Sequence, residues 1–296
     1  MTETKGPTVG ILHPGAMGVS VAAAARAGRA SVLWASDGRS GATAGRAKAA
    51  GLEDAGTLET LCERAPIILS ICPPDAAEAL AETVIATGFD GIFVDANAIA
   101  PERARRIAAR IEAAGARYVD GGIIGVPATA PGTTCLYLSG DEAASVAALF
   151  AGSMLEARVL DATPDRASAL KMCYAAHTKG LTALLCGLVA AAEELGVRET
   201  LFAHWAGEDA GKPNQIAERI RGVTAKAWRF EGEMREISAT LAAAGLPGGF
   251  HLAAADLYAR LAGFKDADGT PVLEAVLAAL IGQGADPEGR LALAGE

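Results

Sequence analysis

The first half of the chain alternates short apolar runs with longer Ala/Glu/Arg-rich stretches of helical periodicity. Glycine, proline and charged residues bound the apolar runs, a pattern that favours buried strands. Because strand–helix–strand units form parallel pairs through right-handed crossovers, the alternation predicts an α/β domain with a mostly parallel sheet. The expected strands cover residues 8–12, 31–35, 67–72, 91–95, 117–120, 134–139 and 157–160.

The pattern changes near Thr163, after which only helical patterns follow. Thr163 supplies a capping hydroxyl, Pro164 suits the first helical position and Asp165 places an acid in the first turn. No turn signal precedes Gly196, which predicts a helix from about Pro164 to Leu195, roughly 50 Å long at about 1.5 Å per residue. Further helices are expected at about 198–207, 215–221, 224–244, 250–263 and 271–281.

These two patterns divide the chain into two expected domains. Residues 1–162 form the α/β domain, and residues 163–296 form an all-α domain that includes the long interdomain helix. We expect a helix of that length to leave a cleft between the domains. The helical half holds more apolar residues than a small domain readily buries, which favours a homodimer packed through this half.

Charge and composition exclude several classes of partner. The net charge is −9 and the pI is about 5.1, whereas a nucleic-acid binder needs a basic face. Charged residues and glycines interrupt the apolar stretches before about 20 residues, and no signal peptide is evident, so we expect a cytoplasmic protein outside the membrane. We expect no metal, since the histidines and cysteines lack ligand spacing; they are His13, His177, His204, His251, Cys62, Cys72, Cys135, Cys173 and Cys186.

The segment TVGILHPGAMG runs from the first strand through a glycine turn into an Ala-rich helix. A dinucleotide needs a tight turn there, a close backbone approach to its pyrophosphate and free amides at the helix start. Gly15 and Gly18 fit the second and third glycine positions, and His13 replaces the first; alternatively, Gly15 only shapes a surface turn. The placement after the first strand favours a nucleotide site made of His13, Pro14, Gly15, Ala16, Met17 and Gly18.

The end of the second strand bears on which dinucleotide is bound. A site for NAD usually has an acid here, which accepts hydrogen bonds from the ribose 2′-hydroxyl. Ser36, Arg39 and Ser40 stand here instead and could together hold a 2′-phosphate. Asp37 favours NAD, and Arg39 could also be a solvated loop residue. We therefore expect NADP, with NAD as the alternative.

Several segments resemble the β-hydroxyacid dehydrogenase and 6-phosphogluconate dehydrogenase-like superfamily. GILHPGAMG resembles its GxxGxGxMG opening. VDANAIAPERARRIA resembles its D-x-S-T-x-x-P segment, with Asp95 and Pro101 in place and Asn97 where serine is usual. LKMCYAAHTKG is similar to the helix that carries the catalytic lysine of the family, which corresponds to Lys171.

The resemblance covers most of the chain. GEMREISATLAAAGLP is similar to a later helix whose Lys-Asp pair corresponds to Arg235 and Glu236. The resemblance implies an N-terminal Rossmann domain, an NAD(P) cofactor, a small-molecule substrate and oxidoreductase activity.

Two departures separate the chain from hydroxyacid dehydrogenases. Their substrate loop reads roughly D-A-P-V-S-G-G, whereas this chain reads DGGIIGVPATAPGT, with Ile124 in place of serine, and Ala175 replaces an asparagine four residues after the lysine. Both changes remove polar contacts to a small hydroxyacid. The loop is also similar to that of imine reductases, a branch that generally lacks the lysine. We assign substrate contacts to the loop residues Gly122, Ile123, Ile124 and Gly125.

Hydride transfer to a carbonyl leaves negative charge on oxygen, so a positioned proton donor is required. Lys171 is the candidate, with a pKa lowered by its apolar neighbours; a solvated helix lysine is the alternative. Tyr174 lies one turn further on the same face and could donate a second hydrogen bond, and His177 follows as a further substrate contact. Both could equally be packed residues.

Asn97 follows a strand end, where nicotinamide and substrate meet in such sheets, and is expected to contact both. Cys72 and Pro73, after the third strand, complete the expected cofactor contacts.

The sequence leads to three hypotheses. The first is an NADP-dependent oxidoreductase that transfers hydride between nicotinamide and an alcohol or carbonyl, with Lys171 as general acid and base. The second is an NADPH-dependent imine reductase, for which the substrate loop is decisive. The third is a non-catalytic dinucleotide-binding sensor, which needs Gly15, Gly18 and Arg39 but has no use for the lysine.

Overall fold

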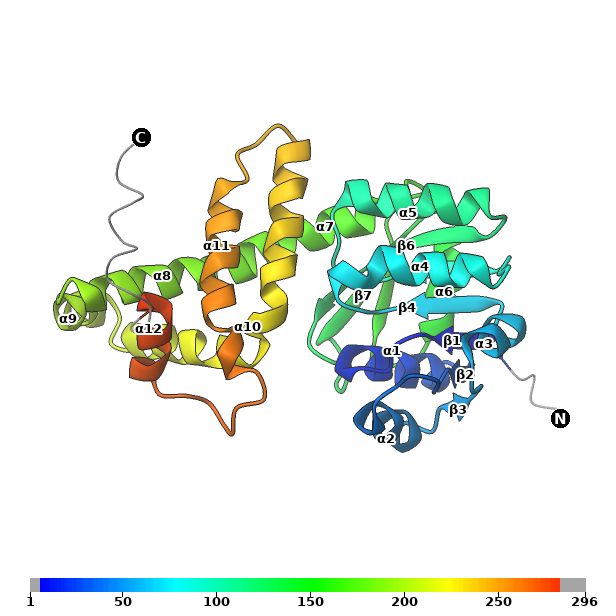
Figure 1. The fold of residues 1–296 in the computed structure, drawn as a ribbon, viewed down its shortest axis with the longest axis horizontal. Helices are drawn as coiled ribbons and strands as arrows, with labels where there is room; N and C mark the ends of the chain where they lie inside the picture. Colours follow the sequence, from blue (N-terminus) through cyan, green and yellow to red (C-terminus); the bar gives the residue numbers. More distant parts are fainter. Residues whose placement is uncertain (1–5, 283–296) are drawn as a thin grey trace. The chain divides into compact units, whose positions relative to one another are not determined.

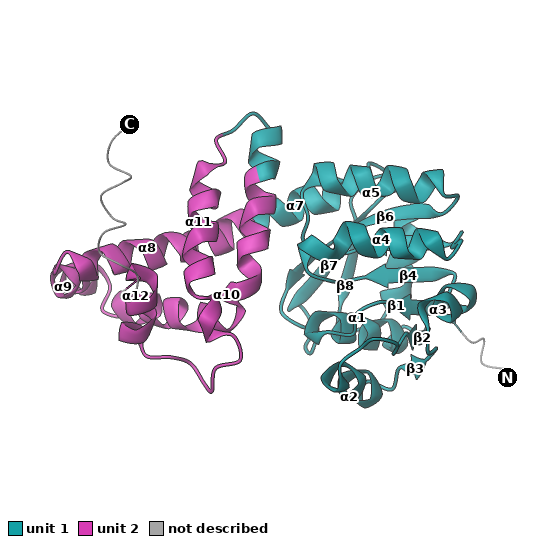
Figure 2. Ribbon diagram, in the orientation of Figure 1, with its two compact units in different colours: residues 1–174, 239–246 teal, residues 175–238, 247–296 magenta. Residues whose placement is uncertain are grey.

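The computed structural model describes residues 6–282, which divide into two compact units (Figure 2). Unit 1 comprises residues 1–174 and 239–246, and unit 2 comprises residues 175–238 and 247–296; residues 1–5 and 283–296 lie outside the described part. The boundary near residue 174 lies beyond the expected 162, because the start of the next helix is hydrogen-bonded to the sheet of unit 1.

Within the described residues, unit 1 holds one eight-stranded sheet of order β3-β2-β1-β4-β5-β6-β7-β8 (Figure 1). Its neighbouring strands pair in parallel, except β6 with β7. The mostly parallel sheet is thereby confirmed. The strands are β1 (Thr8–Ile11), β2 (Ser31–Trp34), β3 (Glu53–Asp54), β4 (Ile67–Ser70), β5 (Ile92–Asp95), β6 (Arg117–Gly125), β7 (Thr134–Ser139) and β8 (Glu156–Val159).

Two strands differ from expectation. β6 continues past Asp120 to Gly125, because antiparallel pairing with β7 supplies hydrogen bonds to a segment whose glycines have low strand propensity. The predicted substrate residues 122–125 therefore lie in a strand and not in a loop. The two-residue β3 was not expected, since Glu53 and Asp54 are charged and exposed.

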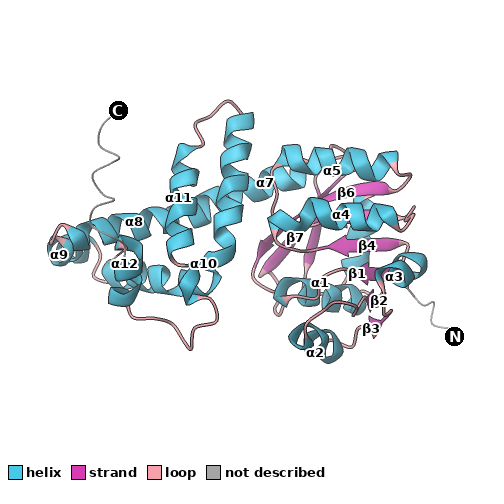
Figure 3. Cartoon of the chain, viewed as in Figure 1, coloured by secondary structure: helices cyan, strands magenta, loops and turns pink. Residues whose placement is uncertain are grey.

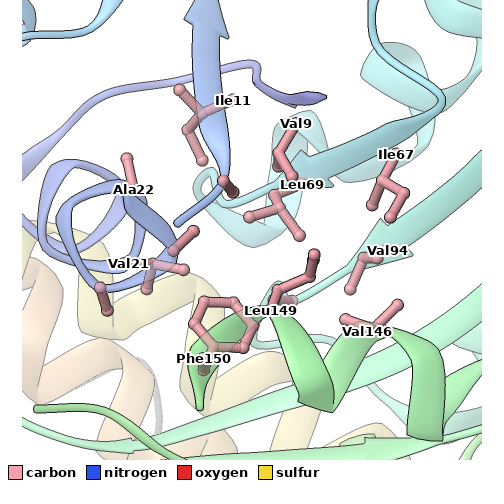
Figure 4. Packing of buried hydrophobic residues seen from close by; sticks show 14 of the residues in the cluster. Val9, Ile11, Val21, Ala22, Ile67, Leu69, Val94, Val146, Leu149 and Phe150 are labelled. Atoms are coloured by element: carbon pink, nitrogen blue, oxygen red, sulfur yellow. The ribbon is translucent and has the colours of Figure 1, made fainter. Parts of the chain in front are cut away.

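Side chains alternate between the two faces of each strand and so build two separate cores. On one face Val9 and Leu69 pack with α1 and with Phe150 (Figure 4). On the other face Ile68 and Phe93 pack with α3, α4 and α5. The helical segments that cover the sheet are α1 (Ala16–Ala27), α2 (Gly41–Ala49), α3 (Leu58–Arg64), η1 (Pro74–Ala76), α4 (Ala77–Ala86), α5 (Pro101–Ala113), α6 (Ala143–Ala147) and η2 (Ala148–Phe150).

The long helix predicted from about Pro164 to Leu195 is divided into three parts. They are α7 (Arg166–Ala175), a π turn, η3 (Ala176–Gly180), and α8 (Leu181–Glu194). By length and mean hydropathy, Arg166–Glu194 would suffice to cross a membrane, a test that core helices also pass; 44% of its most apolar window is buried.

The described residues of unit 2 form helices joined by loops, with no strand among them (Figure 3). The prediction of a break between residues 221 and 224 is wrong, since one helix runs through both expected segments. A glycine such as Gly222 costs only about 1 kcal/mol in a helix interior, and Ile216, Ile220 and Ala227 are buried on either side. The remaining helices are α9 (Arg198–Glu208), α10 (Lys212–Ala243), α11 (Gly249–Arg260), η4 (Ala262–Phe264) and α12 (Leu273–Ile281).

Candidate active site

The turn between β1 and α1 is built for close backbone approach. β1 ends at Ile11 and α1 begins at Ala16, so the connection is tight. A Cβ on Gly18 would clash with the carbonyl oxygen of His13, which explains the glycine there. A Cβ on Gly15 would meet nothing within 4 Å. Glycine at position 15 therefore satisfies no packing need inside the chain, and it leaves the amides at the start of α1 open to a ligand.

Arg39 lies against this turn. Its Nη1 is 2.6 Å from Nε2 of His13, and it forms no ion pair with any residue in the described part of the chain. Burial, and secondly the charge of Arg39, lower the pKa of His13 to about 4, so the imidazole is neutral. Half-buried guanidinium groups usually pair with a carboxylate. Here the described residues leave the charge of Arg39 uncompensated.

Arg46, which the sequence did not single out, is a second cation at the turn. Its Nε donates to the carbonyl oxygen of Pro14 at 3.1 Å, and its Nη2 donates to Oγ1 of Thr43 at 3.0 Å. Both acceptors are neutral. Ser40 caps the same helix, α2, by accepting from the amide of Thr43. The place of Arg46 on the helix after Ser40 was the signal that could have found it.

The other residues of the predicted nucleotide site have mixed roles. The carbonyl oxygen of Ser36 accepts from the amide of Arg39 and so shapes the loop after β2. Asp37, which favoured NAD, is exposed, and its amide donates to the carbonyl oxygen of Gly56. Met17 packs against the core beneath α1.

Two buried nitrogen atoms at the turn, Nδ1 of His13 and Nε of Arg39, have no hydrogen-bond partner among the described residues. Because Nε2 of the neutral imidazole accepts, Nδ1 carries the proton, and both unpaired atoms are donors. Leaving a buried donor unpaired costs about 1–3 kcal/mol. An anionic acceptor brought to the turn would recover that cost, so the residues present fit the phosphates of a dinucleotide.

Asn97 is buried after β5, with every polar atom of its side chain engaged. Its Oδ1 accepts from the amide of Cys72 at 2.6 Å, and its Nδ2 donates to Oγ of Ser70 at 3.0 Å and to Oδ1 of Asp95 at 2.6 Å. The amide thus ties the segment after β4 to the end of β5. It holds Cys72 and the exposed Pro73 in place, and its own side chain offers no unused donor for the contacts predicted to substrate and cofactor.

Two buried carboxyl groups lie side by side in the sheet. Asp95 of β5 and Asp120 of β6 are partners in register. Desolvation raises the pKa of Asp95 to about 7, and burial also raises the pKa of Asp120. Oδ2 of Asp95 and the hydroxyl of Tyr118 are buried without a partner in the part of the chain that the structure describes.

Asp120 holds the start of the helix that carries Lys171. Its Oδ2 accepts from the amide of Ser168 at 2.8 Å, and its Oδ1 accepts from the hydroxyl of Ser168 at 2.5 Å. The hydroxyl of Ser139 accepts from the amide of Ala167 at 3.1 Å and donates to Asp120 at 3.2 Å. The free amides of a helix start favour such acceptors. The first turn of α7 is therefore fixed to β6 and β7.

Lys171 is half-buried, and its Nζ donates to the carbonyl oxygen of Ile123 at 2.7 Å. Gly122 permits this approach, because a Cβ there would press on the backbone of Ala167 and on Cβ of Lys171. Ile123 lies beyond Asp120 on β6, past the carboxyl ends of β4 and β5. Ligands of parallel sheets bind outside these strand ends.

The remaining predicted substrate residues lie on α7, on β6 and in unit 2. Tyr174 is one turn beyond Lys171 on α7 and is 44% exposed. Ile124 is half-buried, and Gly125 ends β6 with a φ of +127°, a conformation that favours glycine. His177 belongs to unit 2, where it is exposed in the π turn.

Unit 2 has an ion pair that no sequence signal indicated. Lys179, in the π turn, pairs with Glu233 of α10, and its Nζ is 4.4 Å from the ring centroid of Phe230. The hydroxyl of Tyr258 donates to the carbonyl oxygen of Lys179 at 2.7 Å. Arg235, at the expected Lys position of the family motif, pairs with Glu231 of its own helix and, at 3.8 Å, with Asp256 of α11.

A hollow elsewhere in unit 1 contains none of these groups. It measures about 570 Å³ and is lined mainly by small apolar side chains from residues 131–132 and 144–157, with Glu156 as its ionisable member. Since hydride transfer needs a proton donor, we do not assign the active site there. No cluster of three or more potential metal ligands occurs in the described residues.

Two family models match parts of the chain. Residues 8–151 match the model of the NAD binding domain of 6-phosphogluconate dehydrogenase, and residues 192–261 match a domain of unknown function, DUF1932. A search of curated proteins gave no match.

Solved structures share the fold over nearly the whole chain. A conserved protein, MTH1747, described as similar to 3-hydroxyacid dehydrogenases, is 25% identical, with a TM-score of 0.61 over 86% of this chain and 97% of that one. 3-Hydroxyisobutyrate dehydrogenase of Mycobacterium tuberculosis, solved with L-serine, is 18% identical, with a TM-score of 0.65 over 94% and 99%. A reductive aminase of Aspergillus terreus, solved with NADPH and ethyl levulinate, is 22% identical, with a TM-score of 0.54 over 92% and 98%.

Proposed function

Because the chain is a member of the β-hydroxyacid dehydrogenase and 6-phosphogluconate dehydrogenase-like superfamily of NAD(P)-dependent oxidoreductases, we propose that it transfers hydride between NADP and a small-molecule alcohol or carbonyl, with Lys171 as general acid and base. The nicotinamide, when bound, supplies or accepts the hydride. The residues of the chain bind and orient the two reactants and move the proton.

The NADP specificity is supported by the cations of the β2–α2 segment. Arg39 and Arg46 are anchored by neutral acceptors, His13, Pro14 and Thr43, and so keep their charge for a ligand. A 2′-phosphate carries up to two negative charges and hydrogen-bond acceptors, whereas a 2′-hydroxyl carries none of the charge. The two arginines therefore favour the phosphorylated cofactor.

The observation that carries the catalytic assignment is the hydrogen bond from Nζ of Lys171 to the carbonyl oxygen of Ile123. The bond directs the ammonium along the end of β6, outside the carboxyl ends of the parallel strands. A substrate carbonyl placed there would accept a hydrogen bond from Lys171 and then its proton as hydride arrives. The reverse reaction would use the neutral amine as base.

Residues beside Lys171 on α7, and residues that follow Ile123 in the chain, bear on the substrate class. Ile124 donates no hydrogen bond from its side chain, and Leu170, Tyr174 and Val126 are exposed. Small 3-hydroxyacids need a polar anchor for their carboxylate, so we expect them to be poor substrates. A larger, less acidic carbonyl compound fits these side chains better.

A panel of NADPH-oxidation assays tests the function and separates the alternatives. Turnover of aldehydes or ketones, at a rate that falls in Lys171→Met, would support the proposal. Turnover of cyclic imines alone would instead favour an imine reductase, and dinucleotide binding without any turnover would favour a sensor. Efficient turnover of 3-hydroxyisobutyrate would contradict the interpretation of Ile124.

A test of cofactor choice needs no substrate. NADPH should bind at least about tenfold more tightly than NADH, or about 1.4 kcal/mol. Arg39→Ala should weaken NADPH selectively, and equal binding of NADH by the unmodified protein would point to Asp37 as a ribose ligand.

A further inference from the structure

His13 replaces a motif glycine and anchors the charge of Arg39 without neutralising it. The 2.6 Å contact joins Nε2 of His13 to Nη1 of Arg39. A guanidinium has donors and no acceptor, so Nε2 must be unprotonated for the hydrogen bond to form. A carboxylate at position 13 would cancel the charge, and a glycine would leave Arg39 unanchored.

The surroundings of the imidazole are cationic. Arg39 comes from the loop after β2, and Arg46 of α2 bonds to the carbonyl oxygen of the next residue, Pro14. Asp37 shares the loop of Arg39 but is exposed and forms no ion pair with a described residue. After β4, burial raises the pKa of Cys72 to about 12, so its thiol is neutral. Among the described residues, no carboxylate therefore favours a proton on His13 in the free protein.

Two further hydrogen-bond donors belong to the pair of His13 and Arg39. Within residues 6–282, the Nδ1–H of His13 and the Nε–H of Arg39 are buried without partners. A ligand that carries several anionic oxygen atoms would satisfy both, whereas a neutral hydroxyl has one oxygen to offer. The unpaired donors therefore point to a phosphate at this place.

Resting on the NADP specificity proposed above, we propose that His13 couples binding of the 2′-phosphate to the uptake of one proton. When Arg39 turns its donors to the phosphate, Nε2 of His13 loses the hydrogen bond that keeps it unprotonated. It then takes a proton from solvent, and the imidazolium adds a positive charge beside the phosphate. NADH, which has no 2′-phosphate, leaves the pair of Arg39 and His13 intact and takes up no proton at His13.

The expected size of the effect follows from the two protonation states. The pKa of His13 is about 4 in the free protein, against an ordinary value of 6.5. If the ordinary value returns in the complex, the protonated fraction at about pH 6 rises from about 0.01 to about 0.75. As the pH falls from about 7.5 to about 5.5, protonation of His13 should raise the ratio of NADPH affinity to NADH affinity about tenfold.

Isothermal titration with NADPH in two buffers of different ionisation enthalpy measures the proton directly. His13→Gln is the matched variant, because a glutamine oxygen can accept from Arg39 but takes no proton. The wild type should take up about 0.7 proton more than His13→Gln at about pH 6, and NADH should show no such difference. The 2′-phosphate itself titrates near pH 6, and the comparison with the variant removes that contribution.

A second measurement avoids the variant. The proton signals of His13 followed by NMR should show its pKa raised by 2′,5′-ADP and unchanged by 5′-ADP. Equal proton uptake in the wild type and His13→Gln, with NADPH still preferred, would overturn the role of His13 and leave the proposed cofactor standing. No preference for NADPH in either protein would overturn the 2′-phosphate site itself.

Discussion

Lys171 is the residue on which the proposed chemistry depends. The first turn of α7, the helix that carries Lys171, is bonded to Asp120 through Ser168. The ammonium of Lys171 donates to the carbonyl oxygen of Ile123. A fixed ammonium can transfer its proton without first paying the entropy of finding the substrate. Neither hydrogen bond could be inferred from residues 168–174 alone, since both acceptors lie about 48 positions earlier in the chain.

Replacing Lys171 should separate binding from turnover. Lys171→Met and Lys171→Arg should fold and bind NADPH nearly normally, yet lose at least about a hundredfold in turnover, because neither side chain releases a proton readily. Stopped-flow oxidation of NADPH measures this. Lys226→Met, at an exposed position on α10, is the control and should keep full turnover. Near-full turnover in either Lys171 variant would make this lysine structural.

Asp95 should make stability depend on pH. Its pKa is about 7 in the folded protein and ordinarily 3.8, so the folded state holds its proton more tightly than the unfolded chain does. The free energy of unfolding should therefore fall as pH rises through this window, by an amount on the order of 4 kcal/mol at most. Asp95→Asn removes the titrating group, so its gain in stability over the wild type should be about 2–3 kcal/mol larger at pH 8 than at pH 5.

Urea unfolding at the two pH values measures this dependence. Parallel stability curves for the wild type and Asp95→Asn would show that the carboxyl group is ionised in the folded protein at both pH values.

At the scale of elements, the β1–α1 turn assigns different tasks to two glycines. Gly18 lets α1 approach the carbonyl oxygen of His13, and Gly15 leaves space open above the helix start. Helix packing and ligand access are thus separate requirements that one motif combines.

The two alanine variants should therefore fail in different ways. Gly18→Ala forces a side chain onto backbone atoms and should lower the free energy of unfolding by about 1–3 kcal/mol, the usual cost of overpacking. Gly15→Ala should keep its stability but bind NADPH and NADH more weakly, since the added methyl group enters the open space. Thermal unfolding and fluorescence titration distinguish the two results. Wild-type dinucleotide binding by Gly15→Ala would place the pyrophosphate elsewhere.

At the scale of the whole molecule, unit 2 exposes a row of apolar side chains. Leu184 and Leu188 of α8 and Phe250 of α11 are exposed and line an apolar groove of about 180 Å³. Exposed apolar patches of this kind often mark protein interfaces. We expect them to be covered in a homodimer that packs through the helical unit.

Mass measurement in solution tests the assembly. The native particle should have twice the 29.9 kDa mass of the chain, and Leu184→Glu with Leu188→Glu should convert it to a monomer. Val272→Glu, at an exposed apolar position outside the groove, is the control and should remain dimeric. A monomeric wild type at micromolar concentration would contradict the expected dimer.

The sequence by itself determined the elements whose signals are local. Apolar runs separated by amphipathic stretches predict strands and helices from neighbouring residues alone, and the mostly parallel sheet follows from their order. The glycine turn was also visible, because Gly15 and Gly18 act within a few residues of the strand before them. Lys171 was found through the resemblance of its segment to a known helix, since a lone lysine carries no such signal.

The tertiary structure decided what depends on contacts between distant segments. β6 extends to Gly125 because β7 pairs with it, and α10 continues through Gly222 because buried residues flank that glycine. The side chain of Asn97 is engaged by groups after β4, and Arg46 reaches the turn before α1. The stability of such contacts depends on which groups are brought together and dehydrated. The periodicity of the sequence does not indicate which distant groups will meet.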